Sequence, residues 1–118
     1  MQPQAKILLI DDDADFVEAT STLLGNFYQV AVAFNGQEGL EKAKMEKPDL
    51  IILDLVLPVM DGFEVYRRLK QDPQLADIPV IMLTCLAGRP DEDLGVEDYI
   101  EKMGLNVMEL LERVRMLI

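Results

Sequence analysis

Two short, wholly apolar runs, each ended by aspartate, constrain the fold of this chain most strongly. Residues 50–53 read Leu-Ile-Ile-Leu and stop at Asp54, and residues 7–10 read Ile-Leu-Leu-Ile and stop at Asp11 and Asp12. Such unbroken apolar runs are typical of strands that are buried on both faces of a parallel sheet. Ligands of parallel sheets bind just beyond the carboxyl ends of the strands. We therefore expect these three carboxylates to meet at one edge of a sheet.

Strand-like and helix-like segments alternate along the rest of the chain, which is the pattern of an α/β fold. Further strands are expected at residues 28–34, 78–83 and 97–100. The first of these alternates more in polarity, as an edge strand would. Helices with an apolar stripe separate the strands. Residues suited to cap their N-termini are Asp13, Asn35, Asp61 and Asn106.

The weakest segment is residues 86–95, which carries Gly88, Pro90, three acidic residues and Gly95. Short helices without a strong apolar stripe are marginal in water, and proline fits only a helix's first turn. We expect one short helical turn or an irregular loop there in place of a full fourth helix. Gly104 is likewise expected to loosen the approach to the last helix.

The composition limits the kinds of protein that the chain can be. Its 118 residues, half of them hydrophobic, suffice for one domain spanning 1–118. No apolar run is as long as a membrane span, and the single cysteine, Cys85, fits a reducing cytoplasm. The net charge of −11 disfavours nucleic acid and anionic lipid as partners. Metal ions and basic protein surfaces are the expected partners.

The chain contains no histidine. This excludes Ser-His and Cys-His catalysis, imidazole metal ligands and a phosphohistidine carried by the chain itself. Chemistry at the sheet edge must therefore come from other groups.

The three carboxylates at the sheet edge indicate a bound cation. Like charges this close are costly unless a cation lies between them, and oxygen ligands suit Mg²⁺. A carboxylate beside Mg²⁺ can attack phosphorus and form an aspartyl phosphate. Asp54 alone would be a weak motif, since a helix cap or a solvated loop acid is the more common explanation of an acid at a strand end. The pair Asp11 and Asp12 strengthens the metal interpretation, because Asp13 is the better helix cap.

Two further strands end in groups that such chemistry needs. Lys102 follows the fifth strand and can pair with phosphoryl charge, and Thr84 follows the fourth strand and offers a hydroxyl. Each is ordinary by itself. Together with the acids, they place a group that phosphoryl transfer requires at the end of four of the five strands.

These stretches resemble the receiver domain of two-component response regulators over nearly the whole chain. The matching stretches are residues 7–13, 49–54, 57–64, 79–84 and 98–102. The resemblance implies a flavodoxin-like fold with a doubly wound, five-stranded parallel sheet in the order 2-1-3-4-5. It also implies that the domain is a phosphoacceptor and not an enzyme, apart from its own phosphorylation and dephosphorylation.

The same resemblance assigns roles to individual residues. It implies that Asp54 accepts a phosphoryl group from a histidine kinase or a histidine phosphotransfer protein. Asp12 would bind Mg²⁺ directly, Asp11 mostly through water, and Val56 through its backbone carbonyl. Thr84 and Lys102 would contact the phosphoryl group. Tyr99 would be the aromatic residue that moves with Thr84.

Two departures from the family leave an alternative open. Met103 and Gly104 replace the usual proline after Lys102, and residues 84–99 are about one helical turn short. Because both changes fall on the face that receivers use for signalling, the alternative is a receiver-fold interaction module with little or no phosphorylation. A phosphatase of the haloacid-dehalogenase type is a third possibility. It would need an aspartate where this chain has Val56, so the general acid for turnover is missing.

Overall fold

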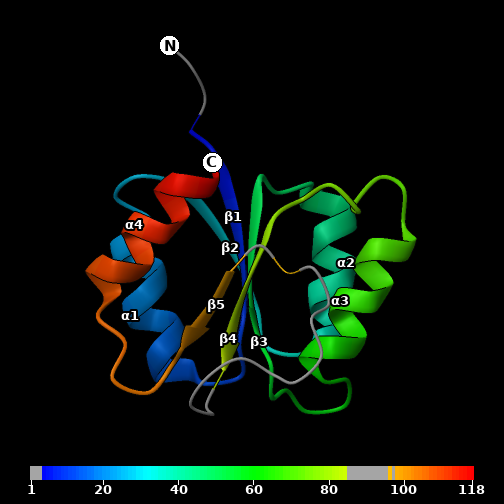
Figure 1. Cartoon of the computed structure of the whole chain (residues 1–118), viewed down its shortest axis with the longest axis horizontal. Helices are drawn as coiled ribbons and strands as arrows, with labels where there is room; N and C mark the ends of the chain where they lie inside the picture. The colour runs from blue at the N-terminus through cyan, green and yellow to red at the C-terminus, as the bar shows by residue number, and fades with distance from the viewer. Residues whose placement is uncertain (1–3, 85–95, 97) are drawn as a thin grey trace.

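The computed structural model is a five-stranded parallel sheet between two layers of helices (Figure 1). It describes residues 4–84, 96 and 98–118. The strands are β1 (Lys6–Ile10), β2 (Gln29–Ala33), β3 (Leu50–Asp54), β4 (Val80–Thr84) and β5 (Asp98–Glu101). The helices are α1 (Ala14–Leu24), α2 (Gly36–Glu46), α3 (Gly62–Gln71) and α4 (Val107–Leu117). The strands lie in the order β2-β1-β3-β4-β5, all neighbours being parallel, which confirms the predicted fold.

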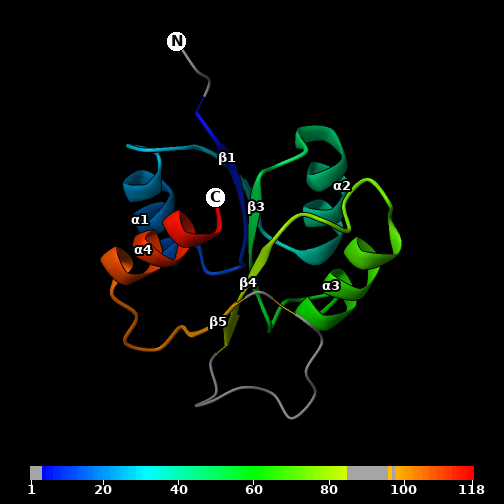
Figure 2. The same cartoon turned by 45° about the horizontal axis from the view of Figure 1, so that its top comes forward.

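The two faces of the sheet carry separate cores. Helices α2 and α3 cover one face, and α1 and α4 cover the other, as both views show (Figures 1 and 2). Ile51 and Leu53 pack toward α2 and α3, whereas Leu50 and Ile52 pack toward α1 and α4. All four side chains are fully buried. The unbroken apolar run of β3 therefore belongs, as predicted, to a central strand that is covered on both faces.

Each helix begins beside the residue predicted to cap it. An Asn or Asp side chain accepts a hydrogen bond from a backbone N–H of the first turn, which satisfies a donor that the helix itself cannot. The donor–acceptor pairs are Phe16 with Asp13, Glu38 with Asn35, Glu64 with Asp61 and Met108 with Asn106. These caps fix where each helix leaves the loop at the edge of the sheet.

The second, fourth and fifth strands differ slightly from the predicted ranges. Tyr28 and Phe34 lie outside β2, and β5 continues to Glu101. Ile78 is not in β4, because its N–H donates to Leu75 O and completes the turn after α3. Thr84, predicted to follow the strand, is its last residue. The N–H of Lys102 donates to Thr84 O at 2.7 Å, which carries the pairing with β5 to this position.

Gly104 lies in a hydrogen-bonded turn that leads into α4. The N–H of Leu105 donates to Lys102 O at 3.1 Å, and Gly104 has φ +74° at the third position of this turn. A positive φ at that position is the mark of a type II turn and favours glycine. A Cβ there would meet no atom within 4 Å, so conformation rather than space requires the glycine.

Some sequence predictions fall on residues that the structure does not describe. They concern Cys85, the short or irregular replacement of the fourth helix at residues 86–95, and the predicted start of the fifth strand at residue 97. Within the described ranges, none of the helices has the length and apolar character that crossing a membrane requires.

Candidate functional site

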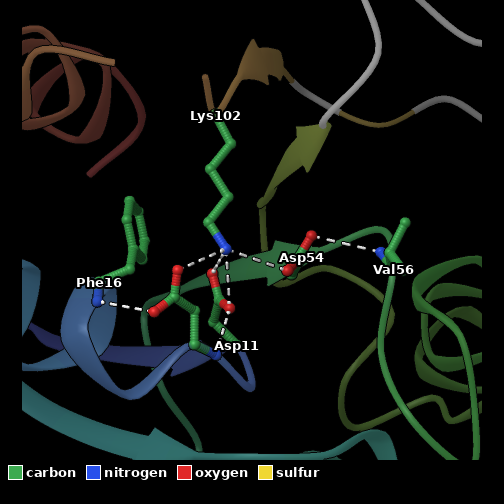
Figure 3. Close-up of polar contacts among 6 residues, drawn as sticks. Asp11, Phe16, Asp54, Val56 and Lys102 are labelled. Atoms are coloured by element: carbon green, nitrogen blue, oxygen red, sulfur yellow. Dashed lines mark hydrogen bonds and ion pairs between the residues drawn. The ribbon is translucent and has the colours of Figure 1, made fainter. Parts of the chain in front are cut away.

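Three strand ends bring Asp11, Asp54 and Lys102 together. Asp11 follows β1, Asp54 ends β3, and Lys102 follows β5. The N–H of Asp11 donates to Ala33 O at 3.0 Å, so the pairing of β1 with β2 holds this residue past the end of its strand. Asp11 is 0% exposed and Asp54 is 2% exposed. Figure 3 shows the side chain of Lys102 reaching between these two carboxylates.

The ammonium group of Lys102 is the centre of the site. Its nitrogen lies 2.9 Å from Oδ2 and 3.0 Å from Oδ1 of Asp11. It lies 3.3 Å from Oδ2 of Asp54 and 3.8 Å from Oδ2 of Asp13. A buried carboxylate pair needs such a cation, because two unpaired charges in a low-dielectric interior are costly.

Burial and charge shift the pKa values of this cluster. Burial, followed by the negative charge of Asp11, raises the pKa of Asp54 to about 6, although Lys102 and the Val56 N–H act in the opposite direction. Burial alone would lower the pKa of Lys102. Its hydrogen bond to Asp11 and the charges of Asp54 and Asp11 outweigh burial and raise that pKa. The ionised form of Asp54 is thus destabilised by the fold, and any further positive charge nearby would stabilise it.

Asp11, Asp12 and Asp54 fit the requirements of a small divalent cation. Each offers a carboxylate oxygen, and these atoms lie within 4.8 Å of one another. Opposite ligands of one Mg²⁺ are about 4 Å apart, so a small rearrangement of these three side chains would bring their oxygens to such spacing. The donors are hard oxygens, which Mg²⁺ prefers. These acids could therefore hold Mg²⁺ as predicted; the backbone carbonyl of Val56 as a further ligand stays a prediction.

The loop after β3 holds Asp54 in place. The N–H of Val56 donates to Asp54 Oδ1 at 3.3 Å, which turns the other oxygen of the carboxylate toward Lys102. Gly62 closes this loop, since its N–H donates to Leu55 O at 2.8 Å. A Cβ at Gly62 would lie 2.4 Å from Asp54 O and 2.7 Å from Leu55 Cα. Only glycine lets α3 start this close to the backbone beside Asp54.

Thr84 and Tyr99 lie on the same face of the sheet. Side chains alternate along β4, so Thr84 faces the same layer as Met82, which packs toward α2 and α3. Tyr99 packs against the same core and pairs with Met82 in the register of β4 and β5. The two residues thus lie on neighbouring strands and on the same face of the sheet. Their action on a phosphoryl group stays a prediction.

The comparisons with known proteins agree with this geometry. The sequence model of the response regulator receiver domain matches residues 7–115. The DNA-binding dual master transcriptional regulator RpaA of Synechocystis is 44% identical, over 96% of this chain and 48% of that protein. The response regulator PleD of Caulobacter vibrioides is 41% identical, over 96% of this chain and 26% of that protein. Chemotaxis protein CheY4 of Vibrio cholerae has 30% identity and a TM-score of 0.88, covering 98% of this chain and 99% of that one.

The chain belongs to the response regulator receiver domain family.

This receiver domain spans less than half the length of the curated relatives just named. Activities of those longer proteins therefore do not transfer to it by similarity. Receiver domains in general accept phosphoryl groups and bind Mg²⁺ in an acidic pocket, and the acidic cluster described above lies where such a pocket is expected.

One contact of this receiver domain was missed by the sequence reasoning. The ring of Phe16 lies 4.8 Å from the ammonium nitrogen of Lys102, measured to the ring centroid. The sequence indicated only that Phe16 belongs to the apolar stripe of the first helix. Its place in the first turn, soon after the acid pair, puts it near the edge of the sheet, but no sequence pattern links it to Lys102.

Proposed function

We propose that this receiver domain accepts a phosphoryl group on Asp54 in a Mg²⁺-dependent reaction, and that the modification switches the binding of a partner protein. The observation that carries the proposal is the buried carboxylate of Asp54, which lies 3.3 Å from the ammonium of Lys102 and beside Asp11 and Asp12. A buried carboxylate with a raised pKa is suited to nucleophilic attack when cations surround it.

The reaction would be a phosphoryl transfer from a phosphohistidine to Asp54. An oxygen of Asp54 attacks phosphorus, the phosphorus–nitrogen bond of a phosphohistidine breaks, and the donor imidazole keeps the electron pair and takes up a proton. Lys102 pairs with the charge on the phosphoryl oxygens. Mg²⁺ held by Asp11, Asp12 and Asp54 would neutralise further charge on those oxygens. These 118 residues contain no histidine, so the phosphohistidine of the donor would lie outside them, on a histidine kinase or a histidine phosphotransfer protein.

The surroundings of Asp54 support storage of the phosphoryl group rather than turnover. Val56 occupies the position where a phosphatase of the haloacid-dehalogenase type would carry its general acid. The chain would therefore be a switch, with Thr84 and Tyr99 reporting the phosphoryl group to the partner. We place this exchange in the cytoplasm, where the single thiol of Cys85 would stay reduced.

Acetyl phosphate, a small phosphoryl donor, tests the proposal without a partner protein. In the presence of Mg²⁺, intact-mass spectrometry should show one added phosphoryl group on the native chain and none on Asp54→Asn. Asp61→Asn is the matched control, because Asp61 lies on the same loop as a helix cap and asparagine caps equally well. Equal modification of the Asp54→Asn variant would contradict the assignment. No modification of the native chain would favour the interaction-module alternative.

A further inference from the structure

We infer that Phe16 is a positioning residue for Lys102, an inference that rests on the proposed function. The face of its ring would hold the ammonium at the mouth of the acidic pocket, ready to meet a phosphoryl group. The ammonium nitrogen lies 4.8 Å from the ring centroid, within the range of cation–π attraction (Figure 3). Phe16 is half-buried and packs against the core on the α1 and α4 face.

The start of α1 fixes the ring in this place. Oδ1 of Asp13 accepts a hydrogen bond from the N–H of Phe16 at 3.2 Å and so caps the helix. Oδ2 of the same carboxylate lies 3.8 Å from the ammonium of Lys102. One side chain thus links the aromatic residue, the first turn of the helix and the lysine. The ring approaches Lys102 from a capped, well-defined turn rather than from a free loop.

The need for a second anchor follows from the other contacts of Lys102. Its short contacts are to Asp11 and Asp54, and both belong to the cluster that would hold Mg²⁺. A divalent cation there would compete for these oxygens and repel the ammonium. Phe16 and Asp13 are not members of that cluster. They would keep the ammonium beside the site after the metal binds.

An aromatic ring suits this task better than another carboxylate. Its attraction for the ammonium comes from the ring quadrupole, so it adds no negative charge that would repel a phosphoryl group. The ring has no oxygen acceptor, and the three N–H donors of Lys102 can turn to phosphoryl oxygens as these arrive. Phe16 would therefore position the lysine without taking part in the transfer itself.

The test compares Phe16→Leu, Phe16→Tyr and a matched control, Phe27→Leu. Leucine keeps an apolar side chain but removes the ring, and tyrosine keeps the ring. Phe27 is also an aromatic residue beside a cation, lying 5.2 Å from the guanidinium of Arg115, but it belongs to the loop between α1 and β2, away from the site. Urea unfolding of each variant establishes that it is folded.

The first readout is the NMR position of the ε-methylene protons of Lys102, assigned by their loss in Lys102→Arg. The Phe16 ring should shift them upfield, with and without Mg²⁺, in the native chain and in Phe16→Tyr. The shift should vanish in Phe16→Leu. Lys70, which lies 5.1 Å from the ring of Tyr66, provides an internal reference that should stay unchanged. A Lys102 shift that is the same in Phe16→Leu, or that disappears from the native chain on adding Mg²⁺, would overturn the inference.

The second readout is the rate of modification by acetyl phosphate at a subsaturating concentration. We expect Phe16→Leu to be slower by about three- to tenfold, and Phe16→Tyr and Phe27→Leu to stay within about twofold of the native rate. A native rate in Phe16→Leu would overturn the positioning role. If the native chain itself takes up no phosphoryl group, the proposed function fails and the positioning role fails with it. The NMR shift would then still report the contact between Phe16 and Lys102.

Discussion

The ammonium nitrogen of Lys102 lies 3.3 Å from Oδ2 of Asp54, at the point where two strands of the sheet end. This contact partly balances the charge of a carboxylate that the fold buries. The contact does not balance the charge of Asp54 fully, because burial and the nearby Asp11 still raise the pKa of Asp54 to about 6. The site thus costs stability when Asp54 is ionised, and that cost can be measured.

Asp54→Asn should stabilise the metal-free domain at neutral pH. The pKa of Asp54 is raised from 3.8 to about 6 by folding, so between these values the native state binds more protons than the unfolded chain. The free energy of unfolding should therefore fall as pH rises from about 4 to about 6, by about 1–3 kcal/mol, and remain low above that range. Asp54→Asn should lack this fall. Urea unfolding at several pH values, with a chelator present, measures it; an unchanged pH dependence in the variant would contradict the account.

Mg²⁺ should raise the stability of the native domain through Asp12. A ligand that binds only the folded state adds about 1.4 kcal/mol at ten times its dissociation constant. Thermal melts should rise with added Mg²⁺, and Asp12→Ala should remove the rise. Asp15→Ala is the control, because Asp15 is also an exposed acid at the start of α1 but does not belong to the acidic cluster. A response of Asp12→Ala equal to that of the native chain would place the metal elsewhere.

Val56→Asn should shorten the lifetime of the phosphorylated form. Hydrolysis of an acyl phosphate needs a water molecule held in line with the bond that breaks, and an apolar side chain cannot orient one. The side chain of Val56 is 62% exposed and stands directly after the site, so an amide there can reach such a water. After acetyl phosphate is removed, intact-mass measurements over time should show faster loss than in the native chain or in the apolar control Val56→Leu. Equal or slower loss in Val56→Asn would show that water access is not limiting.

Val59 should be a destabilising residue in the loop after β3. It has φ +70°, and the N–H of Met60 donates to Pro58 O at 2.7 Å across it, which is the hydrogen bond of a γ-turn. A β-branched residue at positive φ is strained. Because Val59 is 93% exposed, packing of its side chain offsets little of that strain energy. Val59→Asn should raise the free energy of unfolding by about 1 kcal/mol. Val59→Ile, which keeps the strain, should not; equal stability of the two variants would contradict this interpretation.

The central part of the fold could be predicted because unbroken apolar runs and the acids that end them occur together there. The apolar runs before Asp11 and Asp54 determine buried parallel strands, and parallel strands place their carboxyl ends at one edge. Asp11, Asp54 and Lys102 therefore meet in the structure as expected. The helix starts were equally clear, because capping chemistry is local in the sequence.

Other features could not be predicted because they depend on tertiary approach or oppose local preference. The contact of Phe16 with Lys102 requires the first turn of α1 and the end of β5 to meet, which no pattern within either segment indicates. The positive φ of Val59 goes against the conformational preference of valine, so nothing in the sequence indicates it. Gly104 was expected to loosen the chain, whereas it supplies the φ of a hydrogen-bonded turn.

Locating the phosphoryl group chemically tests the central claim most directly. After reaction with acetyl phosphate and Mg²⁺, borohydride reduces an acyl phosphate to an alcohol, so the modified side chain loses one oxygen and gains two hydrogens relative to aspartate. Peptide mass spectrometry of the digested chain should find this change at Asp54 alone, and should find none when Mg²⁺ is replaced by a chelator. The change appearing at Asp11, Asp12 or Asp13 instead, or to the same extent without Mg²⁺, would contradict the proposed role of Asp54.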